Sequence, residues 1–499
     1  MSSIRVTYSG LISFLVGGGT IFTGLIFTLI ITRELSQTEF GTWAVIGTLT
    51  VYALLLRPVI SFWNTREIAR GNESGKTAVM SSGFLAMLGF FIYLVIIYFY
   101  SQGVDIDQNI LLVASILVPI EFFRGVLVGI ANGYKPQVEE YGLVTFEVLK
   151  IIFALSLIYA LDLGLFGLII ALFCSTLSNV LILVFNLRKK LRGSFQKNYV
   201  KKWLKLSWVP LFPNISMLVQ ISEITAFTLI TGGVTGVAYW ASAWTVSRIV
   251  NHSNKMAKAV YPKIVYSGKK EIFENNITHV FYFAFPLAAL SLVFAKPGLF
   301  ALNPIYQIAF PIVFFMVPVV FLRTFTEMFG NVLQSLEKVD VKEDINFKEY
   351  IKSKFVIIPT LRIIHRFSSL GIVIVALLIL VNSSLSELDL VLYWAIVVLA
   401  TQIPYSAFIF YLVRKEVSPK FETKIILKYF LASIIIFGIN YYLIDEFLIY
   451  EESIFIFLPN LFPFLAFGIF GYLGLTYGID KKTRGLVQSI VKEVIKKKR

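Results

Sequence analysis

The chain has 499 residues, of which 57% are hydrophobic and only 15% are charged, and its mean hydropathy is +0.77. A soluble protein has roughly 25% charged residues, so a soluble interior would not hold this much apolar sequence. The composition excludes disordered, fibrous and disulfide-scaffold proteins. It predicts an all-α, polytopic membrane protein.

The formal net charge is +15, but the basic residues fall between apolar runs, which indicates an anionic membrane surface and not nucleic acid. The sequence has one cysteine, Cys174, so an intrachain disulfide is excluded. Its three histidines, His252, His279 and His365, are too few and too scattered for a metal site. We therefore expect neither a metal nor a cofactor.

Apolar runs predict about fourteen transmembrane helices, because a lipid-exposed backbone must satisfy its own hydrogen bonds. At about 21 residues each, fourteen spans occupy roughly 290 residues, close to the apolar total. The first run is long and has no cleavage-type boundary, so we interpret it as a retained helix and not as a signal peptide. The predicted cores are 9–31, 41–62, 78–100, 109–131, 142–160, 163–187, 207–230, 233–252, 279–300, 308–335, 356–381, 388–413, 425–444 and 453–478.

The charges of the loops predict the orientation. Lysines and arginines gather after the even-numbered spans, as in 188–205 and 481–499, whereas the loops after odd-numbered spans carry acids such as Asp105 and Asp445. Because lysine and arginine accumulate on the cytoplasmic side, we expect a multi-pass protein of the cytoplasmic membrane with both termini in the cytoplasm.

Two kinds of segment depart from this simple pattern. The eleventh span carries Arg362, His365 and Arg366 in its first half, so a surface-lying entry helix before a shorter span is an alternative there. Two basic amphipathic segments, 187–205 and 486–499, have the pattern of interfacial helices. They are interpreted either as linker or docking elements or, the interpretation that we favour, as solvated, positively charged anchors on the cytoplasmic side.

The second and eighth spans resemble each other. Each begins with a glycine and an aromatic residue, carries one late arginine (Arg57 or Arg248), and leads into a basic loop that ends in Gly-Lys. This repeat predicts two six-helix bundles related by a parallel pseudo-twofold axis, followed by two extra helices, and transporters of this build bind substrate between their halves. The predicted domains are the first bundle (1–187), a cytoplasmic amphipathic linker (188–206), the second bundle (207–415) and the two extra helices with the basic tail (416–499).

Charged residues inside a bilayer are costly and usually face a cavity or a partner. Three predicted pairs have members three or four residues apart on one helix, so each pair can neutralise itself. These pairs are Glu121/Arg124, Glu147/Lys150 and Arg323/Glu327. Arg124 and Arg323 are retained as candidate cavity cations.

Arg57, Arg248 and Glu223 have no oppositely charged neighbour in their own spans. The arginines either line a cavity or reach back to the cytoplasmic interface. A cavity arginine suits a phosphate, because its planar fork binds two oxygens and stays charged in a dry site. Glu223 is a candidate carboxylate for coupling to protons or cations, or a buried partner of an arginine on another helix.

The segment GNESGKT (71–77) looks like a phosphate-binding loop, but it has three residues between its glycines where that loop needs four. It also follows a membrane span and not a strand, so we expect no nucleotide to bind there.

Three segments resemble the polysaccharide-biosynthesis or oligosaccharide flippase family, which is Wzx-like and belongs to the MATE-like MOP transporter superfamily. The first segment has an Arg-x-Leu turn, an acidic-aromatic-Gly step and a later Arg-Ile-Ala, and the others resemble loops of that family. The segments are TRELSQTEFGTWAVIGTLTVYALLLRPVISFWNTREIARG (32–71), AVYPKIVYSGKK (259–270) and FAKPGLFALNPIYQIAFPIVFF (294–315).

The resemblance implies two six-helix bundles around a central cavity and, as cargo, an oligosaccharide linked to polyprenyl phosphate or diphosphate. Arg57 and Arg248 stand where lipid-diphosphate flippases carry cavity arginines, and Arg33 is a further candidate. Drug exporters of this superfamily typically have a carboxylate in the first helix, and residues 9–31 contain none.

The sequence therefore predicts a non-enzymatic flippase that moves a lipid-linked oligosaccharide outward for the assembly of cell-surface polysaccharide or glycoprotein. Its expected partners are this lipid, other membrane lipids and glycan-assembly enzymes. The alternatives are a cation-coupled drug exporter of the same fold and, from another class, a membrane glycosyltransferase or polymer ligase.

Overall fold

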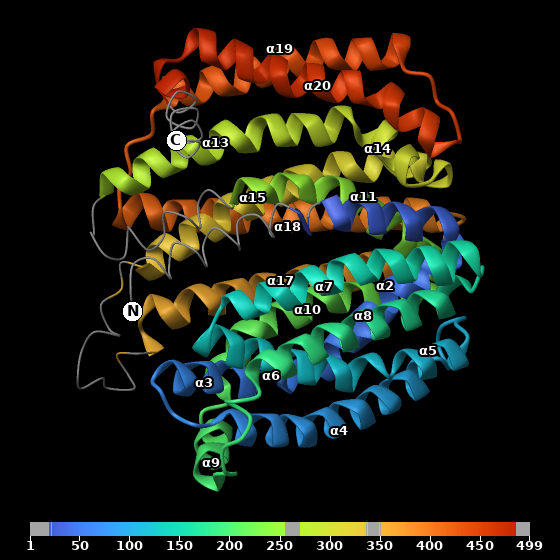
Figure 1. The fold of residues 1–499 in the computed structure, drawn as a ribbon. Helices are drawn as coiled ribbons and strands as arrows, with labels where there is room; N and C mark the ends of the chain where they lie inside the picture. The colour runs from blue at the N-terminus through green and yellow to red at the C-terminus, as the bar shows by residue number, and fades with distance from the viewer. Residues whose placement is uncertain are drawn as a thin grey trace, which may run out of the picture. The chain divides into compact units, whose positions relative to one another are not determined.

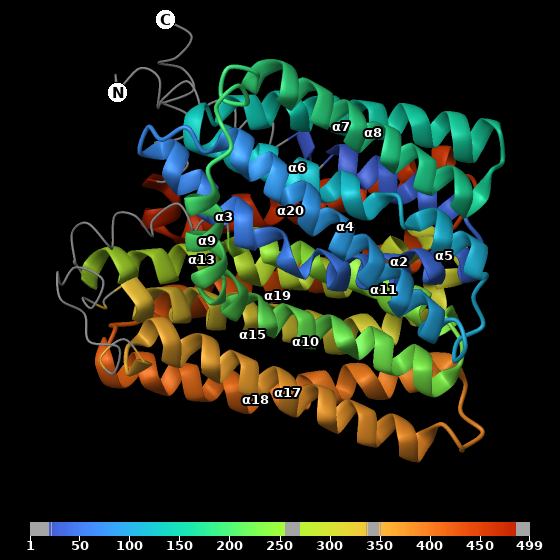
Figure 2. The ribbon, with the colours of Figure 1, turned by 90° about the horizontal axis from the view of Figure 1, so that it is seen from below.

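The computed structural model describes residues 19–20, 22–254, 270–335, 337, 349 and 351–485. All regular secondary structure in these residues is helical. The chain forms two compact units, one of Met1–Ala238 with Leu377–Glu387 and the other of Tyr239–Ala376 with Leu388–Arg499. Figures 1 and 2 show the helices of these units.

Twelve helices of the described chain are long and apolar enough to cross a membrane. Each overlaps one of the fourteen predicted spans. The predicted first and eighth spans are not among the twelve, although residues 22–34 and 235–253 are helical. The count of fourteen stays a prediction, as do the predicted domain boundaries.

The helices of the first unit follow the apolar runs closely. They are α2 (Gln37–Ala53), η1 (Leu54–Leu56), α3 (Arg57–Ala69), α4 (Gly75–Tyr100), α5 (Gln108–Ala114), α6 (Leu117–Tyr134), α7 (Gln137–Ala154), η2 (Leu155–Ala160), α8 (Gly164–Leu187), α9 (Lys197–Lys205) and α10 (Trp208–Thr231), and α11 (Thr235–Ser247) continues into the second unit.

Helix α6 is central in the first unit, because it packs against α3, α4 and α8. Its buried stripe consists of Val118, Phe122, Val126 and Ile130, which recur every fourth residue as expected for one face of a helix. Helix α7 packs along α8, and both views show α4, α6, α7 and α8 side by side (Figures 1 and 2).

Helix α2 begins at a capping box. The Ser36 hydroxyl accepts a hydrogen bond from the Glu39 backbone N–H, and the Glu39 carboxylate accepts one from the Ser36 N–H at 2.9 Å. The second carboxylate oxygen of Glu39 accepts a hydrogen bond from the Leu165 N–H at 3.0 Å, which joins α2 to the start of α8. The acidic residue of the predicted acidic-aromatic-Gly step is therefore a cap.

The amphipathic segment 187–205 is helical only in its second half, as α9, which runs across the long helices in Figure 1. Trp203 is fully buried and stacks on Tyr199, while Lys202 Nζ lies 2.8 Å from the Glu67 carboxylate of α3. These contacts pack α9 against the first unit, whereas its lysines are exposed, so the interpretation as a positively charged anchor stays a prediction.

The second unit contains η3 (Arg248–Ser253), α13 (Lys270–Val293), α14 (Ala295–Leu302), η4 (Pro304–Ala309), α15 (Phe310–Ser335), α17 (Lys354–Leu380), α18 (Glu387–Glu416), α19 (Thr423–Phe447) and α20 (Ile454–Ile479), except that the end of α17 and the first residue of α18 belong to the first unit. One apolar cluster joins α13, α15, α17 and α18, and a second joins α13 and α14 to α19 and α20. Helix α13 is therefore the element that both clusters share.

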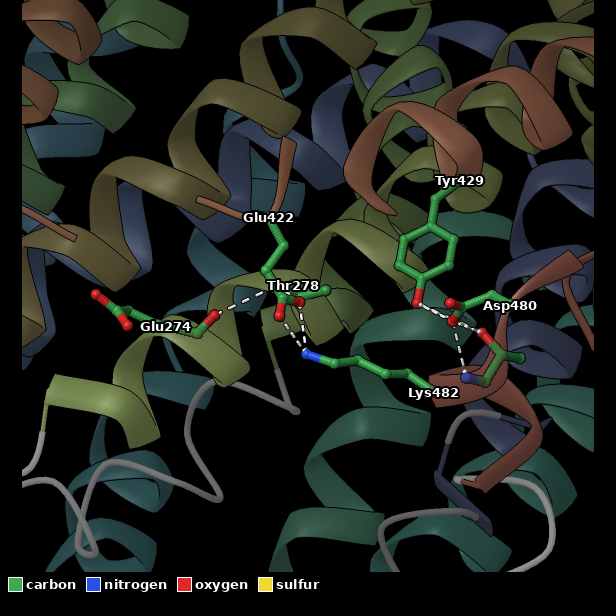
Figure 3. A network of polar contacts seen from close by, with 7 residues as sticks. Glu274, Thr278, Glu422, Tyr429, Asp480 and Lys482 are labelled. Atoms are coloured by element: carbon green, nitrogen blue, oxygen red, sulfur yellow. Dashed lines mark hydrogen bonds and ion pairs between the residues drawn. The ribbon is translucent and has the colours of Figure 1, made fainter. Parts of the chain in front are cut away.

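A polar network holds the last helices at the end of this unit that is predicted to be cytoplasmic (Figure 3). The Asp480 carboxylate accepts hydrogen bonds from the Tyr429 hydroxyl and the Thr483 N–H, both at 2.8 Å. Beside it, Lys482 forms an ion pair with Glu422. Burial raises the pKa of Asp480, but the hydrogen bonds from Thr483 and Tyr429 outweigh burial and lower this pKa below its ordinary value.

Helix α17 runs without a break from Lys354 to Leu380, so the eleventh span has no separate surface-lying entry helix. Such a helix would turn its charges outward to water. Instead His365 and Arg366 are buried, whereas Ile364 and Phe367 are exposed. The basic tail 486–499, residues 255–269, and residues 9–18 of the predicted first span lie outside the described residues.

Candidate functional site

Charged side chains lie in the middle of several spans, where they are most costly. In the first unit, one group consists of Arg57, Glu121 and Arg124. This group is the first part of the candidate site, because Arg57 and Arg124 are candidate cavity cations from the sequence.

Arg57 stands at a break in its span. The α2 helix gives way to the short 3-10 helix η1, and α3 begins at Arg57 with Pro58 behind it. Pro58 has no N–H to continue the α-helical ladder, so the sequence Leu-Leu-Leu-Arg-Pro favours a local change of helix type. Arg57 precedes Ala69, the end of α3, by twelve residues, or about 18 Å.

Glycines of α6 bring this helix close to α3. A Cβ on Gly125 would lie 2.6 Å from Arg57 Cδ, and one on Gly133 would lie 2.6 Å from the Thr65 carbonyl oxygen. Between them, the Thr65 hydroxyl donates a hydrogen bond to the Gly129 carbonyl at 3.0 Å. Small residues at every fourth position let membrane helices approach closely, and here they leave room for the Arg57 side chain.

Glu121 binds both arginines. Its Oε2 lies 3.1 Å from Arg57 Nη1 and 2.8 Å from Arg124 Nη2, and its Oε1 accepts a further hydrogen bond from Arg124 Nε at 3.0 Å. The predicted pair Glu121/Arg124 is thus brought together, with Arg57 added from another helix. Two arginines share one carboxylate, so the group carries one positive charge. Its side chains remain 20–35% exposed.

The predicted pair Glu147/Lys150 is also brought together, with Lys150 Nζ 2.8 Å from Glu147 Oε2. Lys150 further contacts the rings of Phe27 and Phe146, and the Thr23 hydroxyl donates to Glu147. Lys150 is only 7% exposed. Through the contacts with Thr23 and Phe27, this pair joins α7 to the helix of residues 22–34.

Glu223 is 2% exposed on α10. The helix face next to it binds α2, since the Tyr52 hydroxyl lies 2.9 Å from both the Ser222 and the Thr225 hydroxyls. Glu223 is therefore buried and does not face lipid. Arg33, the further candidate from the resemblance, lies next to Glu34 at the end of the helix 22–34 and is half-buried.

Arg248 occupies the same kind of position in the second unit that Arg57 has in the first. It is the first residue of the 3-10 helix η3, which directly follows α11. No carboxylate of the described residues forms an ion pair with Arg248. Both repeat arginines therefore mark a transition between α and 3-10 helix.

Arg323 on α15 reaches α18. Its Nε donates to Gln402 Oε1 at 3.2 Å, and its guanidinium lies 5.9 Å from the centre of the Trp244 ring. Glu327, predicted to pair with Arg323, accepts a hydrogen bond from Asn254 at 3.1 Å. The self-neutralising pair of this helix stays a prediction.

Sequence reasoning missed the residues that surround Arg323. Gln402 Oε1 also lies 3.3 Å from His365 Nε2, and the His365 ring stacks on Tyr405 with centroids 4.4 Å apart. The available signal was Gln402, a polar residue in the middle of a long apolar run. Cys174 and the histidines do not gather into a metal site in the described residues.

No model of a known protein family matches this sequence, and no curated protein sequence matches it either. Solved structures do match in fold. An inward-facing multidrug resistance MATE family transporter of the MOP superfamily superposes with a TM-score of 0.60 at 16% identity, over 80% of this chain and 94% of its own. The chain has the MATE fold.

Two further structures agree. MATE in the bent conformation gives a TM-score of 0.53 at 18% identity, over 83% of this chain and 94% of its own. A MOP superfamily transporter from Pyrococcus furiosus, for which a reverse polarity of the binding pocket suggests a different function, gives 0.53 at 15% identity, over 83% and 95%. At these identities the likeness establishes the fold, an all-helical membrane protein of two bundles.

Within this MATE fold the two units differ in charge. Among the charged residues that stand eight or more residues from either end of a described span, the first unit has three cations (Arg57, Arg124, Lys150) that balance three carboxylates (Glu121, Glu147, Glu223). In the second unit three arginines (Arg323, Arg362, Arg366) stand with one carboxylate, Glu327. The excess of positive charge is therefore in the second unit.

A cavity of about 240 Å³ lies where α2, α5 and α8 begin, and its lining is acidic. Its lining includes Glu39, Asp105 and Asp107. Carboxylates disfavour an anion, so this cavity does not suit a phosphate group.

Proposed function

We propose that this protein is a transporter that moves an oligosaccharide linked to polyprenyl phosphate or diphosphate across the cytoplasmic membrane, from the inner to the outer leaflet, by alternating access. The observation that carries the proposal is the excess of arginine over carboxylate within the spans. An arginine fork binds two oxygens of a phosphate and keeps its charge in a dry site.

The arrangement of Arg57 adds to this argument. Its guanidinium stays partly exposed while Glu121 holds it beside Arg124. An ion pair that already satisfies one side of each arginine orients both forks and leaves a net positive charge for an arriving anion. A purely anchoring arginine would need neither a carboxylate partner nor a glycine opposite its stem.

The first helix supports an anionic cargo over a cationic drug. The described residues 22–31 contain no carboxylate, and neither does the rest of the predicted span 9–31. The MOP transporter from Pyrococcus furiosus, with its reverse polarity of the binding pocket, is a precedent for pockets of different polarity on this fold.

The membrane potential provides a driving force for such a cargo. A negative charge that leaves an inside-negative cell gains about 2.3 kcal/mol per 100 mV. If the arginines do not cross the membrane with the cargo, each net negative charge of the diphosphate increases the free energy that favours outward transport. The proposed transport therefore needs no nucleotide hydrolysis.

The test is a transport assay with the purified full-length protein in vesicles. We expect a polyprenyl-diphosphate-linked glycan to reach the opposite leaflet, where an added glycosidase or lectin detects it, and an inside-negative potential to accelerate its outward movement. Protein-free vesicles and vesicles with a heat-inactivated sample are the controls. Transport of a cationic dye with no movement of the glycan would replace this proposal with the drug-exporter alternative.

A further inference from the structure

The buried face of α17 changes from apolar to polar and back along its length. Ile358, near its start, and Val373, near its end, are 2% and 0% exposed, and between them lie His365, Arg366 and Ser369, all less than 9% exposed. The opposite face is apolar and exposed, as at Phe367. A helix that turns an arginine and a histidine into the bundle, where burial of charge is expensive, does so for a partner or a ligand.

The hydrogen bonds around Gln402 define the state of His365. Arg323 Nε only donates, so the atom of Gln402 that faces it must be the amide oxygen. The amide nitrogen then donates to the Ser406 hydroxyl at 2.9 Å. Because the same oxygen lies 3.3 Å from His365 Nε2, this ring nitrogen must carry a proton and donate. Arg323 and His365 thus present two donors to one oxygen.

Tyr405 adds a hydroxyl that is not fully satisfied. Its oxygen is buried, and Arg362 approaches it as a hydrogen-bond donor. Because an arginine only donates, this contact leaves the proton of the hydroxyl without an acceptor. Arg362, Arg366 and Glu327 all lie close enough to interact electrostatically with it. Buried polar atoms are nearly always hydrogen-bonded, so such an atom beside arginines indicates a group that the protein alone does not supply.

We propose that the middle of the second unit contains a binding site for a phosphate-type anion, formed by Arg323, Arg366 and the Tyr405 hydroxyl, with His365 holding Gln402 in place beside Arg323. The two arginines and the hydroxyl are donors, and three arginines with one carboxylate on α15 and α17 leave a surplus of positive charge for an anion to neutralise. The site rests on the proposed function in one respect, since it assigns the phosphate or diphosphate of the cargo to this unit.

The first experiment measures binding of inorganic pyrophosphate to the purified full-length protein by calorimetry. We expect Arg366→Gln to weaken binding about tenfold or more, the loss expected for a charge-assisted hydrogen bond. Tyr405→Phe keeps the ring stack and removes only the oxygen, so it should weaken binding about threefold to tenfold. Arg414→Gln, which removes an exposed arginine at the end of α18, should leave binding unchanged.

Size-exclusion profiles and melting temperatures establish that each variant is folded. If Arg366→Gln does not fold, Tyr405→Phe and Arg323→Gln provide the same comparison. Equal pyrophosphate affinity in the folded Tyr405→Phe, Arg323→Gln and unmodified proteins would overturn the site, and so would the absence of any measurable binding.

A phospholipid headgroup offers the same chemistry as the cargo, and a second arm separates the two sources. The binding experiment is repeated in nanodiscs of phosphatidylcholine alone and in nanodiscs that also contain phosphatidylglycerol. We expect pyrophosphate affinity to be equal in both, and a polyprenyl diphosphate to compete with it. Competition by phosphatidylglycerol that Arg366→Gln abolishes would assign the site to a membrane lipid and overturn the assignment to cargo.

Glycan transport distinguishes this site from the proposed function. Pyrophosphate binding that depends on Arg366, in a protein that moves no glycan in vesicles, would keep the anion site and reject the proposed cargo. Normal glycan transport by Arg366→Gln, together with unchanged pyrophosphate binding, would keep the function and reject the site.

Discussion

The side chain of Arg57 lies against Gly125. A Cβ added to Gly125 would lie 2.6 Å from Arg57 Cδ, closer than two such carbon atoms can approach. Both residues lie in the middle of spans, and the missing side chain of Gly125 lets Arg57 pass along α6 to Glu121. The position of the arginine therefore depends on a glycine of a helix that lies about seventy residues away in sequence.

We predict that Gly125→Ala displaces Arg57 and reduces glycan transport, while the protein still folds, because the clash is with a flexible stem and not with backbone. Gly133→Ala meets the Thr65 carbonyl oxygen instead and should lower the melting temperature. Gly47→Ala on α2, where a Cβ has open space, is the matched control and should preserve both glycan transport and the melting temperature. Full transport by Gly125→Ala would contradict the role given to this contact.

The polar network around Asp480 predicts a pH dependence of stability. Its pKa is lowered in the folded protein from an ordinary value of 3.8, so the carboxylate stabilises the folded state above that pH. This contribution is lost as the pH falls through the lowered pKa. We expect Asp480→Asn to lower the melting temperature at neutral pH. Below about pH 4, the difference in melting temperature between this variant and the unmodified protein should become smaller.

Thermal unfolding followed by intrinsic fluorescence in detergent, over a series of pH values, measures this effect. Asp445→Asn, which changes an exposed carboxyl at the other end of α19, is the control and should follow the unmodified protein at every pH. A constant difference between Asp480→Asn and the unmodified protein across the whole series would show that ionisation of Asp480 is not the cause.

The orientation predicted from the loop charges has its own test. A reporter fused after Lys205 and one at the C-terminus should both be cytoplasmic, whereas a reporter inserted within 382–389 should be outside. Helix α9 ends at Lys205 and bears the basic residues that carry this expectation. An external C-terminus would contradict the prediction of fourteen spans with both termini in the cytoplasm.

Helix positions could be predicted from the sequence because each apolar run is bounded by polar or charged residues. The predicted span 356–381 corresponds to α17, Lys354–Leu380, and the predicted span 453–478 to α20, Ile454–Ile479. The MATE fold also followed from the resemblance and from the even number of spans per half. These features depend on local sequence and on the thickness of the membrane.

The partners within the site could not be predicted in the same way. Glu121 pairs with Arg124 at the spacing of one helical turn, but its contact with Arg57 depends on how α3 packs on α6. The position of Gln402 between Arg323 and His365 likewise depends on three helices. Side-chain spacing on one helix is readable from sequence, whereas contacts between helices require the packing itself.

Glu223 gives a prediction about coupling. Its buried position on α10 fits a carboxylate that exchanges a proton or cation during transport. Under this hypothesis Glu223→Gln should leave glycan transport driven by the membrane potential but insensitive to proton or sodium gradients. Transport rates in vesicles with imposed gradients measure this, with Glu73→Gln in an exposed loop as control. An unchanged response to both gradients would exclude Glu223 from coupling.

The final prediction concerns the two repeat arginines, which both stand where α-helix meets 3-10 helix. Lysine keeps the charge but loses the planar fork, so an anchoring residue should tolerate it and a phosphate-binding residue should not. We expect Arg57→Lys and Arg248→Lys both to reduce glycan export, Arg248→Lys by about tenfold and Arg57→Lys by more, in a strain that depends on this protein, with protein level and membrane insertion unchanged. Arg57→Lys should be the more severe, because the fork of Arg57 also binds Glu121. Arg414→Lys, at an exposed helix end, is the matched control. Normal export by both variants would falsify a role in cargo binding and leave these arginines as anchors of the helix ends.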